Sequence, residues 1–317
     1  MGNKDDKASS KICASVMDAI GNTPIVRLSK VFAATPRIQV MAKLEFMNPS
    51  GSIKDRMVRY MLRSAGEQRQ LAAKRVVESS SGNTGASLAM ASAILGFQCD
   101  ITVPDKTSAE KVKRIRAYGA DVHVCASDVH DAHPSSYQST AVAMAREAEC
   151  FHLDQYESAL NAEAHYYDTA PEIWSQLDGK FDYFVCGIGS GGTISGIGRY
   201  LKERAPSIRV IGVEPAGSSY SREHRGGGAD FHSRIEGVGK RAPAGSFDRS
   251  VVDEVIQVSD DDALEFCHRL AREEGILAGG SSGCVAAGIA QLIPAIGEGR
   301  VLTIFPDSGA FYLSKYF

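Results

Sequence analysis

The sequence lacks the features that mark several classes of protein. No apolar run approaches the ~20 residues that a membrane-spanning helix needs, and no apolar signal-peptide core is present near the start. The net charge is only −3 in 317 residues and the basic residues are scattered, so no basic patch for nucleic acid stands out. The seven cysteines include no Cys-x-x-Cys pair, which fits reduced thiols and not a disulfide framework. We therefore expect a cytoplasmic protein that binds neither nucleic acid nor membrane.

Tryptophan and proline are also scarce, whereas glycine is abundant. The chain has one tryptophan and 11 prolines against 31 glycines. The glycines are clustered, while a disordered chain would scatter them. Glycine clusters in a well-packed chain indicate places where the backbone lies close to another group.

The order of apolar segments predicts an α/β fold. Strand-like runs alternate with helix-like runs, and several of the strands are almost continuously apolar, as expected for parallel strands covered on both faces. Repeated β-then-α order favours right-handed crossovers and a mostly parallel sheet. In such sheets, ligands bind where strands end and helices begin. The predicted strands are residues 37–44, 75–79, 100–103, 121–124, 182–188, 209–213 and 301–305.

The first glycine-rich turn holds a lysine in an unusual place. Residues 48–56 read Asn-Pro-Ser-Gly-Ser-Ile-Lys-Asp-Arg, and Ser52 is a good N-cap for a helix that starts near Ile53. Lys54 then lies in the first helical turn, where the helix dipole disfavours an ammonium group and partial burial lowers its pKa further. Such a lysine is a candidate Schiff-base nucleophile. The alternative is an ordinary exposed lysine.

The second glycine-rich turn suits a carboxylate. Residues 78–85 read Glu-Ser-Ser-Ser-Gly-Asn-Thr-Gly and lie between a predicted strand and a predicted helix. The turn offers hydroxyls, an amide and the N–H groups of a helix N-terminus. The alternative is an ordinary Ser/Gly loop with a helix cap.

The third glycine-rich turn suits a phosphate. Residues 187–193 lie between a strand and a helix, where backbone amides converge on an anion. Gly187, Gly189 and Gly192 also match the dinucleotide pattern G-x-G-x-x-G, and Glu214 stands where a ribose-binding acid is expected. This motif alone therefore leaves an NAD-dependent dehydrogenase as a rival, and a purely structural turn as the alternative to both.

Together the three turns resemble the fold-type II pyridoxal-phosphate-dependent β-replacement family, which contains the cysteine synthases and cystathionine β-synthases. The resemblance runs from residues 20–24 (Ile-Gly-Asn-Thr-Pro) to residues 306–308 (Pro-Asp-Ser), and includes residues 236–239 and 274–283. A dehydrogenase accounts for only one of these motifs. Residues 154–156 (Asp-Gln-Tyr) and 248–253 favour the catalytic core of cystathionine β-synthase over the cysteine synthases.

The resemblance implies a role for individual residues. Lys54 is the catalytic lysine, which binds pyridoxal 5′-phosphate as a Schiff base and removes the α-proton of the substrate. Asn83 is placed at the 3′ oxygen of the cofactor and Ser308 at its pyridine nitrogen. The full cofactor set is Lys54, Asn83, Gly189, Ser190, Gly191, Gly192, Thr193 and Ser308, and the substrate set is Ser80, Ser81, Thr84, Gln155 and Gly237. No metal site is expected.

The same resemblance implies the architecture and the reaction. Two α/β lobes with twisted, mostly parallel sheets are expected, a larger one of residues 1–40 and 150–317 and a smaller one of residues 41–149, with Lys54 in the cleft between them. The reaction is β-replacement on L-serine or an O-activated L-serine through an aminoacrylate, with a thiol that gives cystathionine or cysteine. A homodimer is the family expectation.

Two basic residues leave a second reaction open. Lys240 and Arg241 follow the loop of residues 237–239, where the family more often has an apolar or acidic stretch. Their charge favours an anionic co-substrate or a phosphorylated serine. The alternative reaction makes a 2,3-diaminopropionate precursor from O-phosphoserine and an amine donor.

Three further groups of residues are poorer functional candidates. Lys43 lies in a predicted strand outside any glycine turn, so it is a weaker rival to Lys54. Residues 216–238 form an irregular segment that is either an active-site loop or an exposed loop without a function. Metal-ligand types crowd near residue 128, but their spacing matches no zinc pattern and predicts a polar surface loop: His123, Cys125, Asp128, His130, Asp131 and His133.

Overall fold

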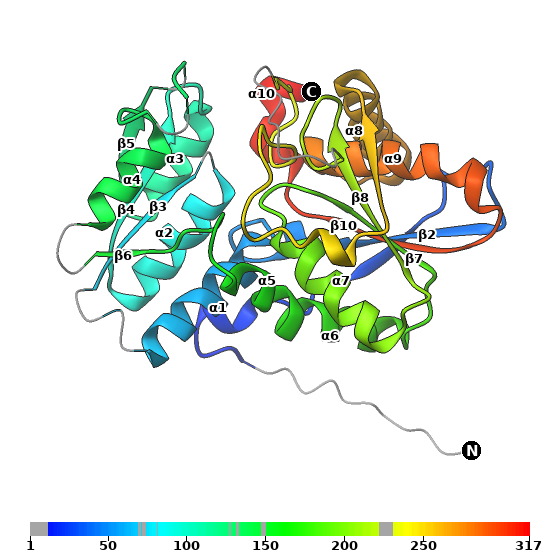
Figure 1. The fold of residues 1–317 in the computed structure, drawn as a ribbon, viewed down its shortest axis with the longest axis horizontal. Coiled ribbons are helices and arrows are strands. Elements are labelled where there is room, and N and C mark those ends of the chain that lie inside the picture. Colours follow the sequence, from blue (N-terminus) through cyan, green and yellow to red (C-terminus); the bar gives the residue numbers. More distant parts are fainter. Residues whose placement is uncertain are drawn as a thin grey trace.

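The chain folds into two sheets with helices packed around them (Figure 1). The computed structural model describes residues 12–68, 71, 74–80, 82–126, 128–130, 133–146, 150–221 and 231–317. Residue 81 lies outside these ranges, and so do residues 222–230 of the irregular segment 216–238. None of the described helices is long and apolar enough to cross a membrane.

The larger sheet has six strands in the order β1-β2-β10-β7-β8-β9. β1 runs antiparallel to β2, and the other neighbouring pairs are parallel. The strands are β1 (Ile25–Leu28), β2 (Ile38–Leu44), β7 (Tyr183–Gly187), β8 (Arg209–Pro215), β9 (Glu254–Val258) and β10 (Gly299–Phe305).

The smaller sheet has four parallel strands in the order β5-β4-β3-β6. They are β3 (Arg75–Ser79), β4 (Gln98–Pro104), β5 (Asp121–Cys125) and β6 (Cys150–His152). The predicted α/β class with mostly parallel sheets is therefore confirmed. β2 belongs to the larger sheet and β6 to the smaller one, so the sheets divide the chain a few residues away from the predicted lobe limits at residues 41 and 149.

Helices follow most strands, as the crossover rule requires. Helices α1 to α4 accompany the smaller sheet in Figure 1, and α7 to α9 accompany the larger one. The helices are α1 (Lys54–Glu67), α2 (Asn83–Leu95), α3 (Ala109–Ala117), α4 (Tyr137–Ala145), α5 (Leu160–Ala164), α6 (Ala170–Leu177), α7 (Gly192–Arg204), α8 (Asp260–Glu274), α9 (Gly280–Ile296) and α10 (Leu313–Tyr316). A π-helical turn, η3 (His165–Thr169), joins α5 to α6, and the 3₁₀ turns are η1 (Val16–Ala19), η2 (Glu45–Met47), η4 (Arg249–Val251) and η5 (Gly309–Tyr312).

Alternating side chains of the larger sheet fill two separate cores. Val185 and Ile211 join a cluster that includes Leu270 of α8 and Ile289 of α9. The neighbouring residues in the same strands, such as Phe184, belong to a second cluster on the other face with helix α7. Because successive strand residues point to opposite faces, a sheet covered on both sides needs continuous apolar strands, which is the pattern seen in the sequence.

The centre of the larger sheet positions the start of α1. β10 lies between β2 and β7, so the loops after these strands emerge at one edge. The backbone N–H of Ile53 donates to the carbonyl of Pro306, just after β10, at 2.8 Å. Ser52 forms a β-bridge with Asp307. These backbone contacts hold the first turn of α1, and with it Lys54, at the carboxyl edge of the sheet.

Candidate active site

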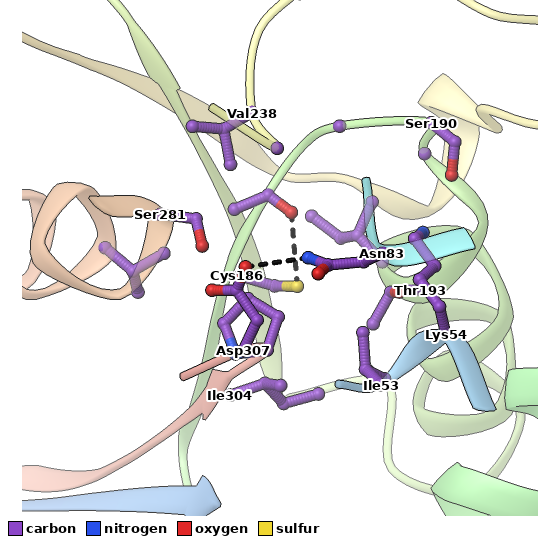
Figure 2. Close-up of a pocket in the computed structure, with 17 residues that line it drawn as sticks. Ile53, Lys54, Asn83, Cys186, Ser190, Thr193, Val238, Ser281, Ile304 and Asp307 are labelled. Carbon is purple, nitrogen blue, oxygen red and sulfur yellow. Dashed lines mark hydrogen bonds between the residues drawn. The ribbon is translucent and has the colours of Figure 1, made fainter. Parts of the chain in front are cut away.

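Lys54 is the first residue of α1 and lines a cavity at that edge (Figure 2). The predicted N-cap is one residue off, because Ile53 caps the helix while the Ser52 hydroxyl accepts the backbone N–H of Lys54 at 3.3 Å. Burial lowers the pKa of Lys54 to about 8, since a desolvated ammonium group is disfavoured. A larger fraction of this amine is therefore neutral near pH 7 than for an exposed lysine.

Segments far apart in the sequence meet at this cavity. Figure 2 shows Lys54 and Asn83, from the first hundred residues, facing side chains from the last hundred and thirty. Most of the predicted cofactor residues are among those that line it: Lys54, Asn83, Gly189, Ser190, Gly191 and Thr193. The sequence motifs thus meet at one place, as expected for loops that follow parallel strands at the carboxyl edge of a sheet.

The glycine-rich segment after β7 approaches the neighbouring backbone too closely for side chains. A Cβ atom on Gly189 would lie 2.2 Å from the carbonyl oxygen of Gly237. Gly191 has φ +95°, a conformation that favours glycine. Gly192 begins α7, so the free N–H groups of that helix start at the cavity. The segment therefore fits an anion such as a phosphate.

Two serines belong to this side of the site: Ser308, the predicted partner of the pyridine nitrogen, directly follows Asp307 in the sequence, and Ser281 is a lining residue. Ser308 is not among the described residues that line the cavity, because it follows the bend after β10 and its hydroxyl caps η5 by accepting from Ala310 N at 3.2 Å. Ser281, in the first turn of α9, does line the cavity, on the side of Asp307 in Figure 2. Sequence reasoning quoted the motif that contains Ser281 but gave that residue no role.

Asn83 and Asp307 form a polar pair within the cavity. Asn83 Nδ2 donates to Asp307 Oδ2 at 2.7 Å, which Figure 2 marks with a dashed line. The hydroxyl of Tyr312 donates to the same carboxylate oxygen at 2.5 Å. Asp307 was not predicted as a site residue, although its place directly after β10 was a signal.

A second, more polar cavity opens from Lys54 toward the smaller sheet. Ser80, Thr84, Gln155 and Gly237 line it, as predicted for the substrate, whereas Ser81 lies outside the described residues. Gln155 is fixed by its neighbours: its Nε2 donates to the Ser79 carbonyl at 3.0 Å, and its Oε1 accepts from the Thr84 hydroxyl at 2.7 Å. Hydroxyl and amide donors gathered next to a lysine suit the carboxylate of an amino acid.

Gly192, a predicted cofactor residue, contributes through its backbone. It is not among the described residues that line either cavity, yet it is the first residue of α7. A Cβ atom there would lie 2.1 Å from Asn161 Oδ1. Asn161 was not predicted either. Its Nδ2 donates to the Gln155 carbonyl at 2.7 Å and to the Ser190 hydroxyl at 2.9 Å, which connects the two cavities.

Glu214, which suggested a dehydrogenase, and Lys43, the rival to Lys54, both contact residues outside the cavity. Glu214 is fully buried and accepts the backbone N–H groups of Tyr220 and Ser221, both at 2.9 Å, so it closes a turn instead of facing a ribose. The ammonium group of Lys43 donates to the Thr23 carbonyl at 2.9 Å and to Glu172, away from the cavity.

The histidine-rich segment shows no metal site within the described residues. His123 Nε2 lies 2.8 Å from Asp100 Oδ1, which is a pairwise contact. No group of three or more His, Cys, Asp or Glu side chains in the described ranges is arranged to hold a metal ion, and Asp131 is outside those ranges.

Comparisons with known proteins define the class. A family model described as pyridoxal-phosphate dependent enzyme matches residues 16–307, so the chain belongs to this family of pyridoxal-phosphate-dependent enzymes. Within it, the chain is of the cystathionine β-synthase and cysteine synthase type. It is 39% identical over 313 residues to the cystathionine β-synthase of Apis mellifera, covering 97% of this chain and 62% of that protein.

Two solved structures are similar over nearly their whole length. The crystal structure of an O-ureido-L-serine synthase matches with a TM-score of 0.89 and 31% identity, covering 96% of this chain and 95% of that one. An O-acetylserine-dependent cystathionine β-synthase from Helicobacter pylori matches with a TM-score of 0.87 and 34% identity, covering 96% and 98%. The chain spans about 60% of the length of the curated relatives it matches.

The residues present fit pyridoxal phosphate, the cofactor of the family. The glycine segment before α7 offers a cradle that a Cβ atom would fill, and the lowered pKa of Lys54 suits a nucleophilic amine. The dehydrogenase interpretation therefore gives way to the pyridoxal-phosphate one.

Proposed function

We propose that this chain catalyses β-replacement on L-serine or an O-activated L-serine, with a thiol as the incoming nucleophile. The observation that carries the proposal is Lys54, a desolvated lysine between a glycine-rich helix N-terminus and a cavity of hydroxyl and amide groups. Relatives named for cystathionine synthesis and for O-acetylserine dependence support the choice of substrate class.

Each part of the site has a task in this proposal. When bound, pyridoxal phosphate supplies the electron-accepting ring that weakens bonds at the α- and β-carbons of the substrate. The backbone of residues 189–192, Thr193 and the N-terminus of α7 hold the phosphate. We propose that Asn83 donates to the 3′ oxygen and that Ser308, next to the lining residue Asp307, faces the pyridine nitrogen. A neutral hydroxyl there leaves the ring a moderate electron acceptor, which favours elimination over a long-lived carbanion.

The substrate is oriented from the smaller sheet. Ser80, Thr84 and Gln155 hold its carboxylate, with Ser81 and Gly237 proposed as further contacts. Lys54 accepts the α-proton as a neutral amine and later returns a proton, which its lowered pKa favours at neutral pH. Asn161 donates to the carbonyl of Gln155 and to the hydroxyl of Ser190, so it fixes the substrate region relative to the phosphate segment.

The lysine variant tests the core of the proposal. Lys54→Ala should lose both turnover and the visible absorption of lysine-bound cofactor, because the covalent link is gone. Lys180→Ala, which removes an exposed lysine, is the matched control and should keep both. Wild-type protein that acquires no such absorption with added pyridoxal phosphate would contradict the proposal.

The two substrates are identified by a crossed assay. L-Serine, O-acetylserine and O-phosphoserine are each combined with sulfide, homocysteine, cysteine and glutamate, and products are separated by mass. We expect a thiol product from serine or O-acetylserine. A product formed only with glutamate would replace this reaction by the alternative below.

The cationic entrance of the substrate cavity supports a second candidate. Lys106, Lys111 and Lys240 line this cavity, against one acidic lining residue, Glu236. The Lys240 ammonium group lies 3.3 Å from the centroid of the Tyr156 ring, at the wall of the cavity. This charge suits O-phosphoserine as the first substrate and an amine donor that gives a 2,3-diaminopropionate precursor.

A single substitution separates the two candidates. Lys240→Ala should lower kcat/KM for O-phosphoserine relative to O-acetylserine if the charge selects the phosphate. Lys180→Ala again serves as the control. An unchanged ratio between the two substrates removes the support for the second candidate.

Assembly and location belong to the same proposal. We propose a homodimer, supported by the family resemblance, and a cytoplasmic location, supported by seven cysteines of which none forms a disulfide in the described residues. Light scattering on the purified protein measures the assembly directly.

A further inference from the structure

Arg114 of α3 is a largely buried cation with few partners. Its Cζ lies 3.8 Å from the centroid of the Phe311 ring. Its Nη2 donates to Asn83 Oδ1 at 3.3 Å, while Nε and Nη1 are buried without a hydrogen-bond partner among the described residues. Burial lowers the pKa of this guanidinium. The carboxylates of Asp307 and Asp55 attract this charge, but its two buried donors without hydrogen bonds cost stability, so stability alone does not explain an arginine here.

The neighbours of Asn83 determine how its amide is oriented. A guanidinium can only donate, so the atom of Asn83 that faces Arg114 is the oxygen. At the other end, Asp307 Oδ2 accepts from Asn83 Nδ2 at 2.7 Å. The two partners together fix the orientation of the Asn83 amide, because Arg114 can only donate and the Asp307 carboxylate accepts. One N–H of Nδ2 is used by Asp307, which leaves the second for a group in the cavity.

We propose that Arg114 is a positioning residue for the cofactor, acting through Asn83. It holds the Asn83 amide with its N–H donor toward the ring oxygen of the cofactor, and its charge polarises the amide so that this donor is stronger. The proposal rests on the proposed function, which places the cofactor against Asn83. Phe311 contributes by holding the guanidinium plane in place.

The variant Arg114→Met separates a positioning role from a structural one. It keeps the apolar stem and removes the donors. We expect the stability of the cofactor-free protein to change little, because the lost attraction to Asp307 and Asp55 is offset by the removal of two buried donors without hydrogen-bond partners. The Kd for pyridoxal phosphate should rise roughly five- to twentyfold and the absorption maximum of the bound cofactor should shift. Arg114→Lys should recover part of the affinity, and the exposed Arg116→Met, on the same helix, should change nothing.

Asn83→Ala distinguishes failure of this inference from failure of the proposed function. If Asn83→Ala leaves the Kd and the spectrum unchanged, the cofactor does not lie against Asn83 and the proposed function is wrong at this point. If Asn83→Ala weakens binding, Arg114→Met should have no further effect in that background. The role of Arg114 would be overturned if the two substitutions had additive effects on the Kd. It would also be overturned if Asn83→Ala weakened cofactor binding while Arg114→Met did not.

A second variant keeps the inference testable if Arg114→Met does not fold. Phe311→Leu removes the ring beneath the guanidinium and should weaken cofactor binding in the same direction. A folded Phe311→Leu protein with the wild-type Kd and spectrum would also overturn the inference.

Discussion

Arg56 is among the largest side chains that the protein buries completely. It pairs with the fully buried Glu45, Nε to Oε2 at 2.7 Å, and with Glu172, Nη1 to Oε2 at 2.8 Å. It lies two residues after Lys54 in the first turns of α1. The network therefore fixes the helix that carries Lys54, the proposed catalytic lysine, and burial of Arg56 and Glu45 limits the screening of their charges by solvent.

Removing this arginine should be costly. Arg56→Leu leaves the fully buried Glu45 carboxylate without its cation, while Glu172 keeps Lys43, and we expect the free energy of unfolding to fall by about 3–5 kcal/mol. Denaturant titration of the cofactor-free protein measures the change. Arg63→Ala on the same helix removes an exposed pair with Glu67 and should cost under about 0.5 kcal/mol. Equal effects of the two variants would contradict this account.

The lowered pKa of Lys54 predicts how cofactor capture depends on pH. Only the neutral amine attacks an aldehyde, and burial lowers the pKa to about 8. The rate at which cofactor-free protein binds pyridoxal phosphate should therefore rise with pH and level off above about 8, because protonated amine is consumed through that range. Stopped-flow absorption measures the rate. A rise that continues toward pH 10 would indicate an unperturbed lysine.

A site residue can be predicted from the sequence when it stands in a short motif, but not when its role depends on contacts with distant residues. Lys54 and Asn83 were predicted because each stands in a short motif with a local reason for its chemistry. Ser308 stays a prediction: it caps η5 directly after the lining residue Asp307, while Ser281, which lines the cavity from the first turn of α9, was given no role. Arg114 carried no signal at all, because its contacts are with residues about 30 and 200 positions away.

Glycines of α7 allow helices to pack at backbone distance. A Cβ atom on Gly196 would lie 2.1 Å from the carbonyl oxygen of Ala162 in α5 and 2.9 Å from the backbone nitrogen of Tyr166 in the π-helical turn. The same turn places His165, whose Nε2 lies 3.1 Å from the Thr193 hydroxyl at the cavity. Helix packing and the phosphate cradle are therefore coupled through α7.

Two helical glycines form a matched pair for testing this coupling. Gly196→Ala should destabilise the protein by about 1–3 kcal/mol or more and weaken cofactor binding, because α7 must move away from α5. Gly66→Ala, near the end of α1, meets only Leu71 Cδ1 at 3.9 Å and should stabilise the protein by up to about 1 kcal/mol. Thermal unfolding with and without cofactor checks both values, and a neutral Gly196→Ala would contradict the close approach.

Strand prediction failed at three of the four edges of the two sheets. The seven predicted strands correspond to β2, β3, β4, β5, β7, β8 and β10, while β1, β6 and β9 were missed. All three missed strands lie at an edge, and most of their residues are only half-buried. An edge strand needs no continuous apolar run, so its signal in the sequence is weak.

A charged contact joins the two halves of the molecule over the substrate cavity. Lys111 of α3, next to the smaller sheet, pairs with Glu236, which belongs to the segment between β8 and β9 of the larger sheet. Lys315 pairs with the same carboxylate at 2.6 Å. Burial alone would raise the pKa of Glu236, but the two lysines outweigh it and lower the pKa, so the contact stays charged at neutral pH.

This contact should affect catalysis more than stability. Lys111→Met and Glu236→Gln should each raise the KM for the amino-acid substrate several-fold, because the two walls of the cavity are no longer held together. The double variant should be little worse than either single one, with a coupling energy of about 1 kcal/mol. Lys113→Met, exposed on the same helix, is the control. Strictly additive effects on kcat/KM would show that the two residues act independently.

The position of β10 has a consequence for synthesis of the protein. β10 separates β2 from β7 in the middle of the larger sheet, yet it is made after all the other strands. While the chain is being translated, β2 can pair with β1 but lacks its other neighbour, β10, until some 250 more residues have been made. During this time β7, β8 and β9 form a separate fragment. When residue 305 emerges, one strand closes the sheet, and the residues directly after it complete the cavity. The larger sheet and the cavity that fits the cofactor are therefore completed together, once β10 and the residues directly after it have been translated.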